Sequence, residues 1–553
     1  MNKKRRFNPI LAGMVCSLTW GISLSQEDSS PVVTHIFTDW TKVDPGNAIF
    51  PVDLTHVSVH DRQLIAKVHD YYKVTMVISE GPTASRRIRA ASGVKIAIEK
   101  GRLDGPWLKP EKPWERSGIG PRTVIQEDGR YRLWYGCGWT VRDRAVVAPD
   151  GRLKLGSEGG GSGVCYAESE DGLNWKRVSM GMVEFEGSRD NNLITLNGLA
   201  GINGHIFVDP NAPPEERYKT ASLTNIRLYK PNAKSMGGIM GAAVSADGIH
   251  WKRLPEPLWD TYFNSDGGPS IYFDGKLKKY VMLMRQNYPR RRSIARAETS
   301  DFRRWPHPNL VLTPGPEESP SDDFYNNTYL HYPGTENTHL MLTAIYHRDT
   351  SLVDLRLATS LDGIVWNWVS RESIVELGKP GGWAGGSMYA VPSMVQLPDG
   401  RMAVPIVGSS WSHNEWWKVR FQKDRNWPRG IGWATWEDGR LAGIEAGQEG
   451  QFTTQRFRFQ GKPVEVNLRT HGDSGSVAVE LMVEGDPDRK VYRAQPISGN
   501  RIWVPLVWKD AGGIEDLAGK IVRLHFRLFN AKVFGFRSAG LVAVDPLRRP
   551  KSG

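Results

Sequence analysis

A short hairpin motif recurs along the chain and constrains its fold more than any other feature. Asp-Gly supplies the backbone of a tight hairpin, because glycine accepts positive φ and the Ser and Asp side chains can bond the turn. The tryptophan that ends each copy is predicted to pack between strands. Recurring hairpins of this kind favour a β-propeller, with one copy per blade. The motif stands at 169–175, 245–251 and 360–366, with a degenerate copy at 299–305.

A second turn precedes each copy of the motif and separates two strand-like segments. Together the two signals predict five blades, beginning near residues 117, 202, 266, 323 and 387, with the turn at 437–440 closing the last. The many glycines (58), prolines (35) and tryptophans (21) suit short strands and tight turns rather than long helices.

The rest of the chain divides around this core, and the predicted fold class is all-β. Basic residues 3–6 and the apolar stretch 9–24 indicate a signal peptide over 1–25. We expect no membrane span after its cleavage, and a secreted or periplasmic location. The further predicted parts are N-terminal strands that close the propeller (26–113), the five-bladed propeller (114–447), a β-sandwich (448–545) and a tail (546–553).

Charge and cysteine usage bound the partners. The formal net charge is +12, and removal of the four basic residues of the signal leaves +8. This excess is compatible with a merely basic surface or with an anionic polysaccharide, and the dispersed basic residues do not favour nucleic acid. The mature chain keeps Cys137 and Cys165, which suit either one disulfide or two buried thiols.

These features together resemble the five-bladed propeller glycoside hydrolases of families 32, 43, 62 and 68, which include invertase, levansucrase and arabinanase. The chain is more similar still to an uncharacterised group of secreted propeller proteins that end in a sandwich, through its segments 59–65, 217–219 and 439–447. The invertase motifs Trp-Met-Asn-Asp-Pro-Asn-Gly, Arg-Asp-Pro and Glu-Cys are absent. The resemblance therefore implies carboxylates near the start of the innermost strands, without transferring individual residues.

Glycosidic cleavage needs two carboxyl groups across the scissile bond, one protonated and one acting as nucleophile or base. In this superfamily a third acidic residue usually orients the acid. Carboxylates just ahead of the expected inner strands are the candidates, although Asp beside Gly also commonly fixes a turn. In order of preference the catalytic candidates are Asp266, Asp323, Glu115 and Asp190. Asp322 directly precedes Asp323 and belongs to the same segment.

Sugars present apolar CH faces and hydroxyl groups, so aromatic and polar side chains are expected at the mouth of the propeller. Further aromatic candidates there are Trp411 and Trp416. The arginine run 290–292 either meets an anionic group or is a solvated loop. The predicted substrate-binding residues are His205, Arg285, Tyr325, His347, Trp383, Tyr389 and His413.

The sequence thus predicts a secreted glycoside hydrolase that acts on a neutral or an anionic poly- or oligosaccharide. The alternative is a non-catalytic glycan-binding propeller. A lyase or a phosphorylase is a third reading, and a phosphorylase would bring Arg, Lys and His together beside one carboxylate. No cofactor is required, no metal ligand is assigned, and a structural calcium ion stays open. The oligomeric state is left open.

Overall fold

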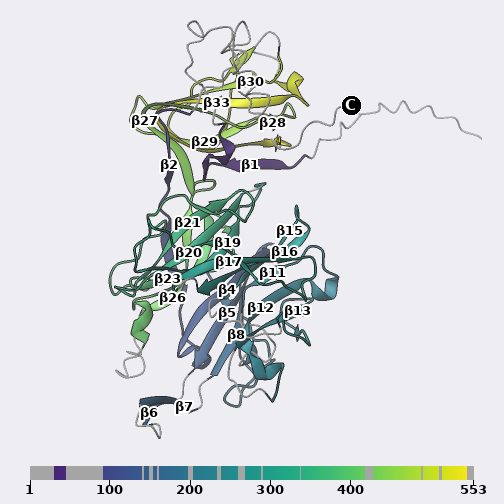
Figure 1. Cartoon of the computed structure of the whole chain (residues 1–553), viewed down its shortest axis with the longest axis vertical. Coiled ribbons are helices and arrows are strands. Elements are labelled where there is room, and N and C mark those ends of the chain that lie inside the picture. The colour runs from purple at the N-terminus through teal and green to yellow at the C-terminus, as the bar shows by residue number, and fades with distance from the viewer. Residues whose placement is uncertain are drawn as a thin grey trace, which may run out of the picture. The chain divides into compact units, whose positions relative to one another are not determined.

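The computed structural model describes residues 30–44, 91–139, 142–147, 153–158, 161–196, 204–232, 238–259, 268–287, 290–336, 338–416, 428–486, 490–509 and 514–544. These residues form strands and short 3-10 helices and no α-helix, so the all-β prediction is confirmed (Figure 1). No helix among them is long and apolar enough to cross a membrane. The predicted signal peptide, the tail and Asp266 lie outside the described residues. The 3-10 helices are η1 (Trp40–Lys42), η4 (Pro113–Glu115), η5 (Pro214–Glu216), η6 (Ile226–Leu228), η7 (His413–Trp416) and η8 (Glu515–Leu517).

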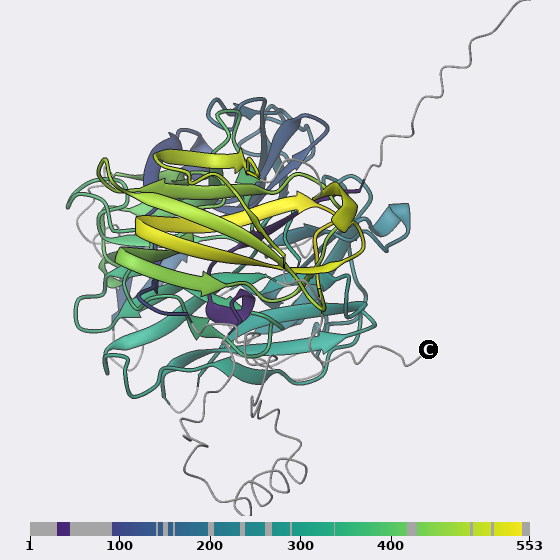
Figure 2. The same cartoon turned by 90° about the horizontal axis from the view of Figure 1, so that it is seen from above.

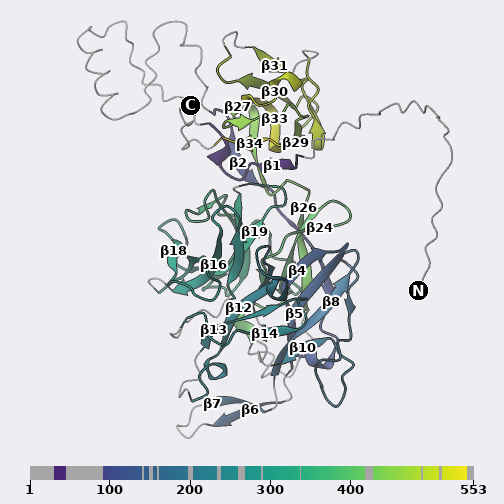
Figure 3. The same cartoon turned by 90° about the vertical axis from the view of Figure 1, so that its right-hand side faces the viewer.

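Three separate antiparallel sheets follow one another along the first half of the described chain, and Figure 3 shows β4, β5 and β8 of the first sheet side by side. A two-stranded hairpin of β6 (Arg142–Val147) and β7 (Leu153–Glu158) branches from the first sheet. The first sheet contains β4 (Gly118–Glu127), β5 (Arg130–Trp139), β8 (Gly161–Ser169), β9 (Lys176–Arg177) and β10 (Leu193–Leu196). The second contains β11 (Ile206–Val208), β12 (Tyr218–Asn225), β13 (Gly238–Ser245) and β14 (Trp251–Arg253). The third contains β15 (Ser270–Asp274), β16 (Lys279–Asn287), β17 (Arg292–Thr299) and β18 (Asn309–Leu312).

A nine-stranded sheet comes next and consists of a four-stranded half and a five-stranded half joined by one parallel pairing, Val353 with Ser387. We treat its two halves as the fourth and fifth sheets. The outer strand of the fifth sheet comes from far earlier in the chain. The fourth sheet is β19 (Asp322–His331), β20 (His339–His347), β21 (Val353–Ser360) and β22 (Asn367–Trp368). The fifth is β23 (Ser387–Ala390), β24 (Val395–Gln396), β25 (Met402–Ser409), β26 (Arg429–Trp436) and β3 (Arg102–Leu108).

The remaining strands form a ten-stranded set around the long strand β33 (Ile521–Ala539), and its yellow and green strands lie side by side in Figure 2. A core of its own, rich in phenylalanine, packs within this set. Two N-terminal strands join it, since β1 (Val32–Ile36) pairs with β33 and β2 (Lys95–Ile98) pairs with β27. The described strands of the segment 26–113 are thus shared between this set and the fifth sheet. The other strands are β27 (Ala442–Thr453), β28 (Phe457–Arg458), β29 (Glu465–Thr470), β30 (Ser476–Val483), β31 (Val491–Arg493), β32 (Asn500–Pro505) and β34 (Val542–Ala543).

The three full copies of the repeated motif fold in the same way. In the first sheet the Ser169 hydroxyl accepts from the N–H of Gly172 (2.9 Å), and Asp171 accepts from two backbone N–H groups further on. Burial opposes ionisation of Asp171, but these hydrogen bonds outweigh it and lower its pKa to about 2. Gly172 has a φ of +73°, and the indole of Trp175 donates to its carbonyl (3.0 Å). Equivalent bonds recur at 245–251 and 360–366.

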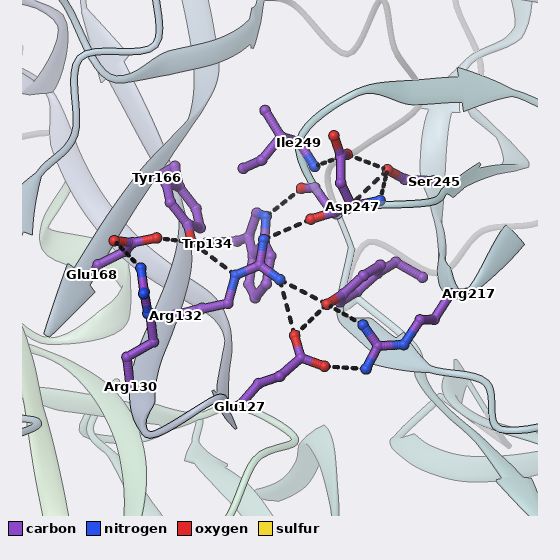
Figure 4. A network of polar contacts seen from close by, with 12 residues as sticks. Glu127, Arg130, Arg132, Trp134, Tyr166, Glu168, Arg217, Ser245, Asp247 and Ile249 are labelled. Atoms are coloured by element: carbon purple, nitrogen blue, oxygen red, sulfur yellow. Dashed lines mark hydrogen bonds and ion pairs between the residues drawn. The ribbon is translucent and has the colours of Figure 1, made fainter. Parts of the chain in front are cut away.

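Each hairpin contacts the preceding sheet. The indole of Trp134 in β5 donates to the Gly248 carbonyl of the second sheet's hairpin (2.6 Å). Beside it, Arg132 reaches the carbonyl of Asp247 in the same hairpin (2.6 Å) and pairs with Glu127 (3.0 Å), as Figure 4 shows. These contacts join the first sheet to the second through buried aromatic surface and charge-assisted hydrogen bonds.

The other hairpins also contact the sheet that precedes them. Phe302 of the third sheet packs on Phe207 of the second, with ring centroids 6.0 Å apart. A Cβ at Gly363 of the fourth sheet would lie 3.3 Å from Tyr272 of the third. Asp438, after the fifth sheet, accepts from Tyr332 of the fourth (2.6 Å). In the first hairpin, the Gly172 carbonyl accepts from Trp433 of the fifth sheet (2.8 Å), so the contacts run in a closed cycle.

Two glycines with similar backbone angles test this packing. Gly248 (φ +77°) and Gly129 (φ +74°) both pay a left-handed strain of about 1–2 kcal/mol if replaced by alanine. A Cβ at Gly248 would in addition lie 2.7 Å from Cζ2 of Trp134, whereas nothing lies within 4 Å of a Cβ at Gly129. We expect Gly248→Ala to destabilise the fold by about 1–3 kcal/mol more than Gly129→Ala, measured by urea denaturation. Equal losses would contradict the inter-sheet contact.

Candidate functional site

The four predicted catalytic carboxylates occupy very different places. Asp266 lies outside the described residues. Asp190 is exposed in the loop that precedes β10. Glu115, in η4, and Asp323, in β19, have fully buried side chains. The structure therefore does not bring the described candidates together at one exposed point.

Glu115 is enclosed by hydrogen-bond donors. Its carboxylate accepts from Nε and Nη2 of Arg177 (2.9 and 3.0 Å), from the Tyr135 hydroxyl (2.7 Å) and from the backbone N–H of Glu111 (2.8 Å). Burial alone would lower the pKa of Arg177, but this pairing with Glu115 raises it. A carboxylate held in this way fixes η4 to the first sheet, and it is not placed to receive a substrate.

Asp323 accepts from two arginines. Arg348 donates through Nε (2.9 Å) and Nη2 (3.0 Å), and Arg292 donates through Nη1 (2.6 Å) and its backbone N–H (3.0 Å). Burial favours the neutral acid, but these donors outweigh it and lower the pKa of Asp323. The carboxylate is therefore ionised at neutral pH and orients the two guanidinium groups.

Its neighbour Asp322 belongs to a second ion-pair network. His347 donates from Nδ1 to Asp322 (2.8 Å), and its Nε2 lies 3.4 Å from Asp354. Arg356 donates to Asp322 as well (3.0 Å). The hydrogen bonds to Asp322 and Asp354 raise the pKa of His347 to about 9. Burial opposes ionisation of Asp322, but His347 and Arg356 outweigh it and lower the pKa of Asp322. His347, predicted to bind substrate, is therefore a protonated partner of two aspartates.

Four other predicted residues do come together. Tyr325 in β19, Tyr389 in β23 and His413 in η7 pack against one another, with the Tyr325 and His413 ring centroids 4.8 Å apart. The guanidinium carbon of Arg285, at the end of β16, lies 4.3 Å from the Tyr325 ring centroid. Two residues that were not among the predicted ones complete the group. We call Arg285, Arg292, Tyr325, Tyr346, Tyr389 and His413 the arginine–tyrosine cluster.

The cluster combines cations with partly exposed rings. Tyr325, Tyr389 and His413 are half-buried. Nδ1 of His413 lies 2.6 Å from the Tyr389 hydroxyl. Burial, followed by the charges of Arg292 and Arg285, lowers the pKa of His413, so its imidazole is neutral at neutral pH. When the Tyr389 hydroxyl donates to Nδ1, the ring proton is carried by Nε2.

The other predicted binding residues lie elsewhere. His205 bonds Thr123 of the neighbouring sheet (2.6 Å), and burial lowers its pKa to about 4, so it is a neutral histidine that ties β4 to the start of β11. Trp383 is partly buried, lies beside Gly408 and Gly432 and packs against the core of the fourth and fifth sheets.

Two members of the cluster, Arg292 and Tyr346, were not among the predicted substrate-binding residues. Arg292 was predicted only within the run 290–292, as a contact to an anionic group or a solvated loop, but it is the first residue of β17 and reaches across to Tyr325 and Tyr346 of the fourth sheet. Tyr346 precedes His347 on β20 and so points to the opposite side of the strand. The strand alternation around His347 was the available signal for Tyr346.

The described residues contain no group of three or more His, Cys, Asp and Glu side chains arranged to hold a metal ion. The thiols of Cys137 and Cys165 are free and buried, with their sulfur atoms 2.7 Å apart across β5 and β8.

No protein-family model and no curated protein matches the chain. The chain resembles solved structures of glycoside hydrolases and related enzymes. An α-L-arabinofuranosidase from Podospora anserina is 11% identical over 62% of this chain and 98% of that chain, with a TM-score of 0.38. A β-1,2-mannobiose phosphorylase from Listeria innocua is 12% identical over 63% and 98%, with a TM-score of 0.41. A family 32 β-fructofuranosidase from Bombyx mori is 9% identical over 80% and 94%, with a TM-score of 0.36.

The raised pKa of His347 predicts a pH dependence of stability. Since the folded pKa of about 9 exceeds the usual 6.5, the protonated imidazole stabilises the fold fully below about pH 6.5, and this contribution is lost as pH rises through about 9. The unfolding free energy of the wild type should therefore fall toward that of His347→Gln between pH 6.5 and 9.5, measured by urea denaturation.

His413→Gln is the matched control, because the lowered pKa of His413 leaves it neutral across that range. A difference between wild type and His347→Gln that stays constant from pH 6 to pH 10 would show that His347 is not protonated by its two aspartates.

Proposed function

We propose that the chain is a secreted glycoside hydrolase that cleaves glycosidic bonds of a poly- or oligosaccharide. The observation that carries this proposal is the arginine–tyrosine cluster. Two arginines of the third sheet meet there with tyrosines of the fourth and fifth sheets and a neutral histidine of η7. Aromatic faces pack on the CH faces of sugars, and hydrogen-bonding side chains beside them select hydroxyl groups.

The proposal includes the architecture. The five sheets are taken as blades of one five-bladed propeller, and the strands around β33 as the β-sandwich that follows it. Support comes from the closed cycle of hairpin contacts and from the pairing of β3 with β26, which completes the last sheet with a strand from the start of the chain. In such a ring the starts of β19 and β23 and the ends of β16 and β20 face one rim, where the cluster lies.

The proposed chemistry divides the carboxylates by ionisation. A glycosidase needs one protonated acid and one ionised carboxylate. Asp323 is ionised and held by Arg292 and Arg348, so it suits the third, orienting role. Asp266 and Asp190, of which Asp190 is exposed, are the remaining candidates for the reactive pair, and the roles of acid and base are not assigned between them. Glu115 is assigned to the fold because its side chain is fully buried against Arg177.

One observation favours the alternative, a non-catalytic glycan-binding propeller. Asp322 and Asp323, the carboxylates beside the cluster, are both engaged by cations, and the pKa of each is lowered. A binding protein needs the tyrosines and arginines but no proton donor.

The two functions are separated by the release of reducing ends from a panel of neutral, uronic and sulfated polysaccharides by the mature protein. We expect release by the wild type and a loss of about 10²–10⁴ in kcat for Asp266→Asn, the range expected for a positioned general acid or base. Asp323→Asn should lower kcat less and also lower the melting temperature, because Arg292 and Arg348 lose their shared partner.

Asp473→Asn is the matched control, since Asp473 is an exposed aspartate near strand β30 of the C-terminal set. It should leave both release and melting temperature unchanged. Binding without release on every polysaccharide, unaltered in Asp266→Asn, would replace the hydrolase by the glycan-binding protein.

A further inference from the structure

We propose that a cavity between the fifth sheet and the ten-stranded set, which we call the junction cavity, is a second carbohydrate site. It would hold a neutral segment of a glycan away from the bond that is cleaved. The cavity has a volume of about 590 Å³, and pockets that enclose a small ligand have volumes of roughly 300–1,000 Å³. The inference rests on the proposed function only in taking the ligand to be a glycan.

Both parts of the chain contribute to the walls of the junction cavity. Arg102, at the start of β3, and Glu437, just after β26, come from the fifth sheet. Asn500 and Ile502, on β32, come from the ten-stranded set. A ligand in the cavity would therefore contact both.

The first support is that hydrogen bonds tie the walls together. Arg469 of β29 donates to both carboxylate oxygens of Glu99, between β2 and β3, at 2.7 Å each. Asp438, just after β26, accepts from the indole of Trp503 in β32 (2.6 Å) and from Tyr332 of the fourth sheet (2.6 Å). Since these charge-assisted bonds exist without a ligand, the cavity is preformed and little reordering opposes binding.

The second support is a pair of polar side chains that the chain itself leaves available. In the part of the chain that the structure describes, the Arg102 guanidinium and the Asn500 side-chain amide make no hydrogen bond and no ion pair. Both residues are exposed. The guanidinium offers donors, and the amide offers donors and an acceptor. A ligand in the cavity can bond to both without displacing a protein partner.

The third support is the balance of charge, which indicates the class of ligand. Five cationic and four acidic side chains line the junction cavity. Besides the pair at Glu99, Glu437 pairs with Arg440, and Asp399 pairs with Arg401 (2.7 Å). An anion would meet carboxylates and a cation would meet guanidinium groups, so neither sign of charge is favoured. A sugar hydroxyl both donates and accepts a hydrogen bond, which suits such a lining.

The apolar part of the lining favours a sugar over a peptide. The large apolar side chains of the lining are Ile502 and Trp436. Ile502 is 45% exposed, whereas Trp436 is buried and its indole donates to the Glu99 carbonyl (3.0 Å). A peptide partner anchors on several aromatic or aliphatic contacts, which one exposed isoleucine does not provide. The same side chain can pack against the CH groups of one sugar ring.

The junction cavity is separate from the arginine–tyrosine cluster. Arg401, which lines the cavity, directly precedes β25, and His413 of the cluster follows the other end of that strand. The strand has 8 residues and so spans about 25 Å. A glycan held in the cavity therefore leaves the cluster open, and the cavity raises the affinity for a long glycan by providing a second attachment point.

Calorimetric titration of the mature protein tests the junction cavity. The probes are neutral hexamers of glucose, mannose, galactose and arabinose, with hexagalacturonate and spermine as charged probes. The titrations use the Tyr325→Leu background, which removes one ring of the arginine–tyrosine cluster. We expect at least one neutral hexamer to bind, more tightly than either charged probe.

Two truncations should weaken that binding. Arg102→Ala should weaken it about tenfold or more and Asn500→Ala about threefold, as expected for the loss of a hydrogen bond from a charged and from a neutral group. Ile502→Arg, which places a long cationic side chain at the cavity, should weaken it at least tenfold. Since these three residues are exposed, the melting temperature should stay unchanged.

Arg304→Ala is the matched control for Arg102→Ala. Arg304 is also exposed, but it lies in the hairpin of the third sheet and does not line the cavity. It should leave both binding and melting temperature unchanged.

Three results would overturn the inference. They are no binding of any neutral hexamer, binding that is unchanged in Arg102→Ala, Asn500→Ala and Ile502→Arg, and tighter binding of a charged probe than of every neutral hexamer. Failure here is distinguishable from failure of the proposed hydrolase. Any of these results together with release of reducing ends that is lost in Asp266→Asn would retain the hydrolase. Binding that Arg102→Ala weakens, without release, would retain the cavity and remove the hydrolase.

Discussion

The packing of each sheet's closing hairpin against the neighbouring sheet is the constraint on which the arrangement of the sheets depends, and at two junctions it is a hydrogen bond from a buried indole to the hairpin glycine carbonyl. Trp134 makes it to Gly248, and Trp433 makes it to Gly172. The donor is fully buried in both cases, and a buried indole N–H without an acceptor is costly. The hairpin needs a glycine at this point, both for its positive φ and because the neighbouring ring leaves no room for a Cβ at Gly248.

The candidate site is a consequence of this order. Tyr325, Tyr389 and Arg285 come from three different sheets, so they meet only if the third, fourth and fifth sheets are held next to one another. Within that frame Asp323 fixes the direction of Arg292 and Arg348 through four hydrogen bonds. Ionic groups thus orient the cations, whereas the hairpins set the spacing of the strands that carry them.

Local chemistry made part of this predictable from the sequence. The turn at Asp128 and Gly129 has positive φ at both residues, as the Asp-Gly pair indicated, and the tryptophans of the repeated motif serve the hairpins. Arg285, Tyr325, Tyr389 and His413 were also predicted, because each stands near the start of an inner strand or the end of a second one.

Long-range pairing was beyond the sequence patterns. The joining of β1 to β33 depends on residues some five hundred positions apart, and no local pattern selects that partner. The same limit applies to ion pairing. Asp323 and Glu115 have the sequence setting of catalytic acids, and only the positions of Arg292, Arg348 and Arg177 show that both carboxylates are ion-paired.

The ionised state of Asp323 limits the chemical roles that this carboxylate can have. A carboxylate that two arginines hold ionised cannot give a proton to a leaving group at neutral pH, although it can keep the two arginines in place. The carboxylate that orients the arginines of the cluster would therefore differ from the carboxyl group that donates the proton. The arginine–tyrosine cluster has the groups for recognition, and a proton donor must come from a carboxyl group in a drier, less cationic setting than that of Asp323.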